Sequence, residues 1–442
     1  MNLQTIAFAL LLTPLLAAQD PVAAARLARY NEWKFGMFIH WGPYSQASVE
    51  ASWPIMTPRT YAGITEERYR GLATTFNPTQ FDAKSFVRLA KEAGQRYMVF
   101  TTKHHDGYCM FDSAYTNYKI TKSPYGKDIV AQLADAAREE KMPLGFYYSP
   151  PDMNHPGFRD TTKLSSTNWQ GEPTRPEWPL YVAYLEMQVR ELLTRYGDVA
   201  IVWFDGLGEQ RKYDGYRIHK MIREIQPQAL INDRIGLPGD YATPEQRTPK
   251  GIPTRGAVVG HTDGSKDAGV VTAAPKPADF QPWETCMTIN GTWAYNANDT
   301  RFKSSTDLVR TLIDVASKGG NFLLNVGPTP EGTIQPEFAE RLRAIGAWLK
   351  VNGAAIYGTT YGPWQGLSFG RSTIKGRTAY LHVYDWPKGA LELPTAGEKI
   401  ASARLLATGQ AIPFQQKAGS LTLNVSGLPA SDHATVIELK LR

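Results

Sequence analysis

Short, continuous apolar runs alternate with amphipathic stretches over most of the chain. Runs rich in aromatic and β-branched residues predict buried strands at 35–41, 96–102, 144–149, 199–205, 229–233 and 321–326. Apolar positions with a period near 3.6 predict helices at 82–94, 127–141, 180–196, 213–225, 306–317 and 336–351. Strands that are apolar throughout and separated by helices indicate a parallel sheet covered on both faces. This number of units favours a closed, TIM-like (β/α) barrel of seven to eight units, and no G-x-G-x-x-G follows the first strand to support a dinucleotide-binding sheet.

The pattern changes after about residue 355. Short runs between Gly, Pro and Asp turns predict strands at 378–384, 403–406, 420–425 and 435–441. We therefore expect a barrel domain over 19–354 and a C-terminal β-sandwich over 355–442. The segment 246–280 is rich in Gly, Pro, Thr and Ala, and we expect it to form a long excursion over the barrel mouth.

The first eighteen residues have the pattern of a secretory signal peptide. An apolar run ends in Ala17-Ala18, no charged side chain precedes Asp20, and the run is too short to span a membrane. We expect cleavage near Ala18 and a secreted or periplasmic protein, with a buried N-terminal helix as the alternative. No later run reaches about 18 apolar residues, so no membrane partner is expected.

Composition narrows the function classes. Hydrophobic residues make up 42% and charged residues 20% of the chain, as in ordinary globular proteins. The net charge of +6 comes without a Lys/Arg run, so nucleic acid is not an expected partner. Two cysteines, Cys109 and Cys286, exclude a disulfide scaffold or a cysteine zinc cluster, and two buried free thiols are favoured over a disulfide. Aromatic residues reach 11%, which suits sugar binding as well as a large core.

Polar and ionisable residues end or follow five predicted strands. They are His40, His104 with His105, Ser149, Asp205 and Arg234. Barrel enzymes place their chemistry at the carboxyl ends of the strands, so these side chains should meet at one site. Asp205 closes the apolar run 199–204, and a rigidly held carboxylate beside aromatic rings can attack an anomeric carbon. A capping or salt-bridged Asp is the structural alternative.

The histidines also raise the question of a metal. Asp205 or Asp106 could complete a site with them. However, adjacent residues such as His104 and His105 point to opposite sides of an extended strand, which disfavours chelation. H-E-x-x-H, P-loop and G-x-S-x-G motifs are missing from the sequence, so zincin, phosphate-loop and serine-hydrolase functions lack support, and we expect no metal.

Six motifs, in order along the chain, resemble those of glycoside hydrolase family 29, the α-L-fucosidases. They are F-G-M-F-I-H-W-G (35–42), K-H-H-D-G-Y (103–108), Y-Y-S-P (147–150), W-F-D-G (203–206), W-E-T-C (283–286) and G-N-F-L-L-N-V-G-P (320–328). The resemblance implies a (β/α) barrel followed by a β-sandwich, and retaining hydrolysis of α-L-fucosides without a cofactor. It implies a fucosylated oligosaccharide or glycoconjugate as the substrate partner.

The resemblance also assigns roles to residues. Asp205 matches the nucleophile. The positions that match fucose-binding residues are His40, Trp53, His104, His105, Trp203, Arg234 and Trp293. Among these, Trp293 corresponds to an aromatic position near the fucose methyl group, and Trp53 comes from a variable loop.

The general acid/base has competing candidates. Glu245 lies eleven residues after Arg234, where bacterial members of the family carry this group, and is favoured. Glu284 in W-E-T-C is the alternative, followed by Asp263 or another loop acid. In a retaining enzyme the two carboxyls should lie about 5–5.5 Å apart.

Two other functions remain open from the sequence. One is another retaining barrel glycosidase, such as an α-L-galactosidase, because L-galactose presents the same hydroxyl arrangement to the histidines. The other is a catalytically inactive fucose-binding protein. The sequence shows no coiled-coil pattern from which an oligomeric state could be predicted.

Overall fold

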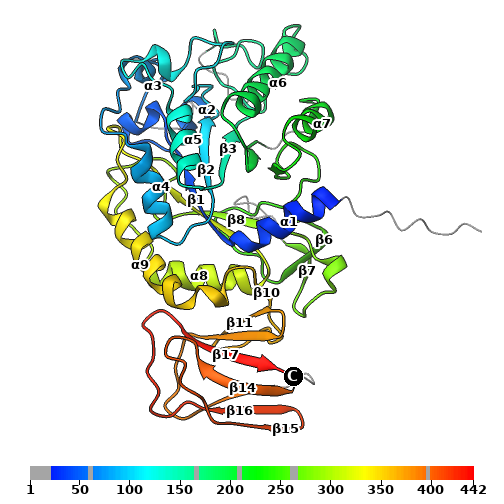
Figure 1. Cartoon of the computed structure of the whole chain (residues 1–442). Helices are drawn as coiled ribbons and strands as arrows, with labels where there is room; N and C mark the ends of the chain where they lie inside the picture. Colours follow the sequence, from blue (N-terminus) through cyan, green and yellow to red (C-terminus); the bar gives the residue numbers. More distant parts are fainter. Residues whose placement is uncertain (1–20, 58–62, 164–168, 207–211, 259–266, 395–398) are drawn as a thin grey trace, which may run out of the picture.

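The computed structural model describes residues 21–57, 63–163, 169–206, 212–258, 267–394 and 399–442 (Figure 1). The predicted signal peptide, residues 1–18, and the candidate Asp263 lie outside the described residues, and both stay predictions.

The larger part of the molecule is built on a curled parallel sheet, which confirms the predicted barrel (Figure 1). Seven strands pair in the order β5-β4-β3-β2-β1-β9-β8. Their bounds are β1 (Phe35–Ile39), β2 (Met98–Lys103), β3 (Leu144–Tyr148), β4 (Ile201–Phe204), β5 (Leu230–Ile231), β8 (Glu284–Thr288) and β9 (Asn321–Val326). Every residue of these strands is buried, which explains why most of them are mainly apolar in sequence.

A short irregular stretch, residues 239–246, closes the wall between the edge strands β5 and β8. Tyr241 bridges to Asn232 beyond β5, and Glu245 bridges to Cys286 in β8, both in the parallel sense. Gly239 permits the close approach, because an added Cβ would lie 2.4 Å from the backbone of Asn232. Glu245 therefore sits on the barrel wall at its carboxyl end, and not on a free loop.

Helices cover the outside of the barrel. They are α4 (Ala83–Glu92), α5 (Ile129–Glu139), α6 (Trp178–Arg195), α7 (Gly215–Ile225), α8 (Ser305–Ser317) and α9 (Pro336–Asn352). Side-chain caps start several of them: Asp128 accepts from the Ala131 amide, and Ser304 with Asp307 forms a capping box. Two short helices, α2 (Trp53–Met56) and α3 (Glu66–Thr75), lie between β1 and α4. Across the described ranges, every helix is too short or too polar to cross a membrane.

Two features near the amino-terminal side of the barrel depart from the sequence analysis: one was not predicted, and the other was predicted at the barrel mouth. Helix α1 (Pro21–Trp33) packs Trp33 on Tyr97 with ring centroids 5.2 Å apart. The described part of 246–280 forms a hairpin, β6 (Ile252–Val258) and β7 (Ala268–Val271), which lies near α1 and β10 (Figure 1). The prediction that this segment covers the barrel mouth is therefore wrong for its described residues.

The C-terminal part is a β-sandwich, as predicted. One sheet has the order β10-β11-β12-β17-β14 and the other β13-β16-β15. Their bounds are β10 (Thr360–Tyr361), β11 (Gly370–Lys375), β12 (Thr378–Val383), β13 (Ala390–Pro394), β14 (Ile400–Leu405), β15 (Phe414–Lys417), β16 (Ser420–Asn424) and β17 (Thr435–Leu441). Alternate residues such as Leu391 and Leu393 face a shared apolar core. The Arg371 guanidinium joins the sandwich to α8 through Asp314 at 2.7 Å.

Candidate active site

A cavity of about 310 Å³ lies where the carboxyl ends of the barrel strands meet. It brings together nine residues singled out from the sequence: His40, Trp53, His104, His105, Trp203, Asp205, Arg234, Glu245 and Trp293. Glu284 does not line this cavity. Residues more than 250 positions apart therefore meet at one site, on the side of the barrel expected from its strand directions.

Asp205 is fixed immediately after β4. Its Oδ2 accepts a hydrogen bond from Tyr147 Oη at 2.7 Å, and His105 Nε2 lies 3.4 Å from the same oxygen. Its Oδ1 pairs with Arg234 Nη1 at 2.9 Å. Burial alone would raise the pKa of Asp205, but the hydrogen bond from His105 and the charge of Arg234 outweigh it and hold the pKa well below the usual range. Asp205 is therefore ionised at neutral pH.

Arg234 joins this carboxylate to a second one. Its Nη2 lies 2.9 Å from Glu245 Oε2, while its Nη1 pairs with Asp205. The guanidinium is positioned by Thr243, whose Oγ1 accepts from Nε at 3.0 Å, and it stacks over Trp203 at 4.8 Å. One buried cation thus holds the two carboxylates at neighbouring positions.

His40 follows β1 and is neutral. Its Nδ1 lies 2.7 Å from Asn325 Oδ1, and the amide nitrogen of Asn325 donates to the Trp293 carbonyl. The amide oxygen therefore accepts from His40 Nδ1–H, which leaves Nε2 as an acceptor. Burial lowers the pKa of His40 to about 4.

His104 and His105 both reach the cavity because β2 ends one residue earlier, at Lys103. Strand alternation does not apply to the turn that holds them, so the expectation of opposite directions is wrong. Their ring centroids lie 4.4 Å apart. Ligand atoms of the two histidines and Asp205 lie within 4.8 Å of one another, a spacing that could hold a metal ion. The ion pair with Arg234, however, already occupies the Asp205 carboxylate.

A serine orients His105. Ser149 Oγ donates its single proton to the Pro151 carbonyl at 2.6 Å. The same oxygen makes a short contact with His105 Nδ1. The Nε2 edge of His105 is thereby directed toward Asp205.

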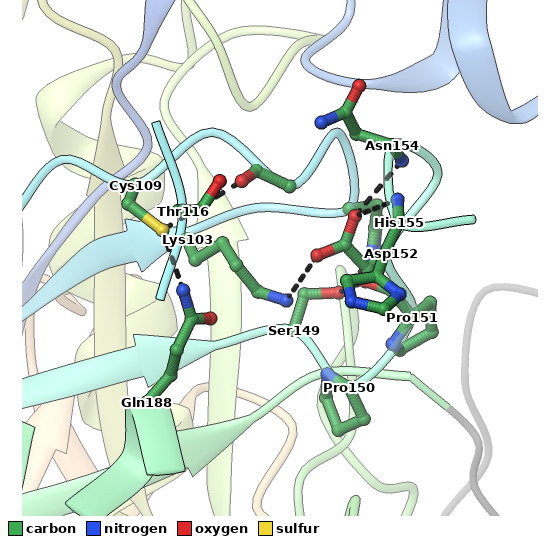
Figure 2. A network of polar contacts seen from close by, with 12 residues as sticks. Lys103, Cys109, Thr116, Ser149, Pro150, Pro151, Asp152, Asn154, His155 and Gln188 are labelled. Carbon is green, nitrogen blue, oxygen red and sulfur yellow. Dashed lines mark hydrogen bonds and ion pairs between the residues drawn. The ribbon is translucent and has the colours of Figure 1, made fainter. Parts of the chain in front are cut away.

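A buried polar network is centred on Lys103 and Asp152 (Figure 2). Lys103 Nζ pairs with Asp152 Oδ2 at 2.9 Å, and the two side chains are 0% and 2% exposed. The other Asp152 oxygen accepts from the amides of Asn154 and His155 at 3.0 and 2.9 Å. The pair thus ties the end of β2 to the loop that follows Ser149. In the same region, Cys109 Sγ accepts from Gln188, and Cys109 is a free thiol, as is Cys286.

Because this ion pair is fully buried, replacing Lys103 with methionine should leave Asp152 as an uncompensated charge. We expect Lys103→Met to reduce the free energy of unfolding by roughly 3–5 kcal/mol, measured by urea denaturation. Lys84→Met is the matched control, since Lys84 pairs with Glu139 at 2.6 Å but both side chains are more than half exposed. The control should lose much less stability than Lys103→Met, because water screens an exposed ion pair. Equal losses in the two variants would contradict this prediction.

Glu284 lies in the barrel interior behind Trp203. Its Oε1 accepts from Trp203 Nε1 at 3.0 Å, and its Oε2 accepts from Tyr97 Oη. Burial raises the pKa of Glu284 to about 7. These contacts suit a group that holds the Trp203 indole.

Glu50, Met56 and Trp169 also line the cavity and were missed from the sequence. Glu50 accepts the Trp293 amide with both oxygens, at 3.0 and 3.1 Å. Burial raises its pKa to about 7, and the charge of Glu245 acts in the same direction. The only signal in the sequence for Glu50 as a site residue was its position ten residues after His40. Trp169 follows a Ser/Thr-rich stretch and gave none.

Comparison with known proteins gives a consistent result. The family model described as alpha-L-fucosidase matches residues 17–354. Among solved structures, α-L-fucosidase isoenzyme 1 from Paenibacillus thiaminolyticus is 35% identical, with a TM-score of 0.83 over 95% of this chain and 100% of that chain. A family 29 enzyme from Bacteroides thetaiotaomicron, solved as a trapped covalent intermediate, is 26% identical, with a TM-score of 0.80 over 96% of this chain and 97% of that chain.

A curated relative, the α-L-fucosidase of Dictyostelium discoideum, is 26% identical over 91% of this chain and 89% of its own length. The family match spans the barrel and includes every residue named above as lining the cavity. The chain therefore belongs to glycoside hydrolase family 29, the α-L-fucosidases.

Proposed function

We propose that this protein is a retaining exo-α-L-fucosidase that removes terminal fucose from glycans by double displacement, with Asp205 as nucleophile and Glu245 as general acid/base. The observation that carries the proposal is the shared guanidinium of Arg234, which pairs with both carboxylates at the cavity. A retaining mechanism needs two carboxyls close together, and it needs one of them ionised. The trapped covalent intermediate of the Bacteroides relative supports a covalent step here.

The first step forms the covalent intermediate. An Asp205 oxygen attacks C1 of the fucosyl group, the bond from C1 to the glycosidic oxygen breaks, and Glu245 gives its proton to that oxygen. In the free protein Glu245 Oε2 lies 2.9 Å from Arg234 Nη2. To donate its proton, Glu245 must exchange this contact for the glycosidic oxygen when a glycoside enters.

The second step releases fucose. Glu245, now ionised, accepts a proton from water as the water oxygen attacks C1, and Asp205 leaves as a carboxylate. The Arg234 cation and the Tyr147 hydroxyl stabilise the carboxylate that is regenerated.

The rest of the cavity suits a fucosyl ring. His40, His104 and His105 offer ring nitrogens to sugar hydroxyls, and neutral His40 presents an acceptor. Fucose carries a methyl group where L-galactose carries a hydroxymethyl group. We assign Trp293 to the apolar wall for this methyl, since its ring lies 4.9 Å from that of His40.

Release of 4-nitrophenol from its α-L-fucoside tests the proposal directly. We expect turnover that is equal with and without EDTA, because the two carboxyls supply both the bond to C1 and the proton. The α-L-galactoside, which carries a hydroxyl against the apolar wall, should be the poorer substrate. Folded protein that hydrolyses neither glycoside would contradict the proposal, and loss of activity in EDTA would contradict the two-carboxyl mechanism.

A further inference from the structure

The cavity changes character between its inner end and its mouth. His40, His104 and Trp203 are buried at the inner end. Trp53 lines the same cavity but is 43% exposed, and Trp169, another lining residue, is half-buried. An indole that both faces the cavity and meets solvent lies at its opening.

The backbone that carries the exposed indole of Trp53 is held by hydrogen bonds. Trp53 begins α2, its amide donates to the Glu50 carbonyl at 2.9 Å, and its own carbonyl accepts from the Thr57 amide at 3.0 Å. The next turn of this segment is held by buried Arg159, which donates to the Ile55 carbonyl at 2.9 Å. Trp169 packs against the main apolar core of the barrel. The Trp169 ring and the backbone that carries the Trp53 indole are therefore held in place before any ligand binds.

An exo-glycosidase encloses the terminal sugar at the inner end, so the remainder of the substrate leaves through the mouth. We propose that Trp53, which the family resemblance assigned to the fucosyl group, instead forms with Trp169 and Met56, all three in the cavity lining, a subsite that binds a cyclic leaving group, either a sugar ring or an aryl ring. Flat indole faces bury the apolar face of such a ring and add contact area outside the fucosyl pocket. The inference rests on the proposed function and adds to it the chemical class recognised beyond the scissile bond.

Three substrates with one fucosyl group separate this subsite from the fucosyl pocket. They are α-L-fucosyl fluoride, whose leaving group is a single atom, 4-nitrophenyl α-L-fucoside, and a fucosylated disaccharide. For Trp53→Ala and Trp169→Ala we expect kcat/KM to fall roughly 3- to 10-fold more for the two ring-bearing substrates than for the fluoride, mainly through KM. Trp169→Phe, which keeps an aromatic face, should recover most of the loss and covers the case in which Trp169→Ala fails to fold.

Tyr216→Ala is the matched control, since Tyr216 is an aromatic residue on α7 that is 64% exposed and does not line the cavity. It should leave all three rates unchanged. Equal losses on the fluoride and on the ring-bearing substrates would overturn the subsite while the hydrolase function stands, and so would no loss on any of them. Wild-type protein that fails to hydrolyse the fluoride would instead overturn the proposed function, and the subsite with it.

Discussion

Replacing Asp205 with alanine should reduce kcat/KM for 4-nitrophenyl α-L-fucoside by about four orders of magnitude or more, because the variant has no group that can form the bond to C1. The fold should survive, since Asp205 lies at the end of β4 and not within the core. Stopped assays at high enzyme concentration measure the residual rate. Full activity in Asp205→Ala would contradict the assignment.

Asp314→Ala is the matched control for this variant. Asp314 is also little exposed and paired with two cations, Lys318 and Arg371, both at 2.7 Å, but it lies on α8 against the sandwich. We expect it to lower stability and to leave kcat nearly unchanged. Azide gives a further check on Asp205→Ala, because a small anion can attack C1 in place of the missing carboxylate. A single displacement should yield a fucosyl azide of inverted configuration.

Replacing Glu245 with alanine should slow hydrolysis by roughly 10²- to 10⁴-fold for natural glycosides and much less for activated aryl fucosides. An aryl leaving group departs without a proton, so only poor leaving groups need the acid. Azide should restore turnover of the aryl substrate, since it needs no general base. Here it attacks the covalent intermediate, and two displacements give a fucosyl azide of retained configuration.

Glu284→Gln is compared with Glu245→Ala in the same two assays, which are the dependence on the leaving group and the rescue by azide. Glutamine can accept from Trp203 Nε1 through its amide oxygen and donate to Tyr97 Oη through its amide nitrogen, so it can keep both contacts of Glu284 in the barrel interior. We expect a modest loss that is similar for good and poor leaving groups and that azide does not change. If azide rescued a Glu284 variant and not Glu245→Ala, the two roles would have to be exchanged.

The sequence predicted the parts of the barrel whose strands are buried on both faces. Strands β1 to β4 and β9 carry continuous apolar runs, because a parallel sheet inside a ring of helices has no polar face. Strand β8 was missed, since Glu284, Thr285 and Thr288 interrupt its pattern. These polar side chains are buried and find partners inside the barrel, which local sequence does not reveal.

Site residues were predictable where they directly end or follow a strand. His40 and Asp205 are examples, because strand direction alone brings them to one end of the barrel. Glu50 and Trp169 come from connecting segments, and only tertiary packing brings them to the cavity. Glu245 is positioned by bridges from 239–246 to the two edges of the sheet. These bridges could not be predicted, because a stretch that contains Pro244 has no strand pattern in its sequence.

Residues 239–246 close the barrel before the hairpin begins, so sequence changes in the hairpin need not displace the active site. Glu245 is anchored by its bridge to Cys286, by the hydrogen bond from the Gln246 amide to the Cys286 carbonyl at 2.9 Å, and by the hydrogen bond from Thr285 Oγ1 to the Arg247 carbonyl at 2.6 Å. The hairpin of β6 and β7 begins only after these residues and lies away from the cavity. Insertions, deletions or grafted modules can therefore accumulate in this hairpin while the proton donor keeps its place.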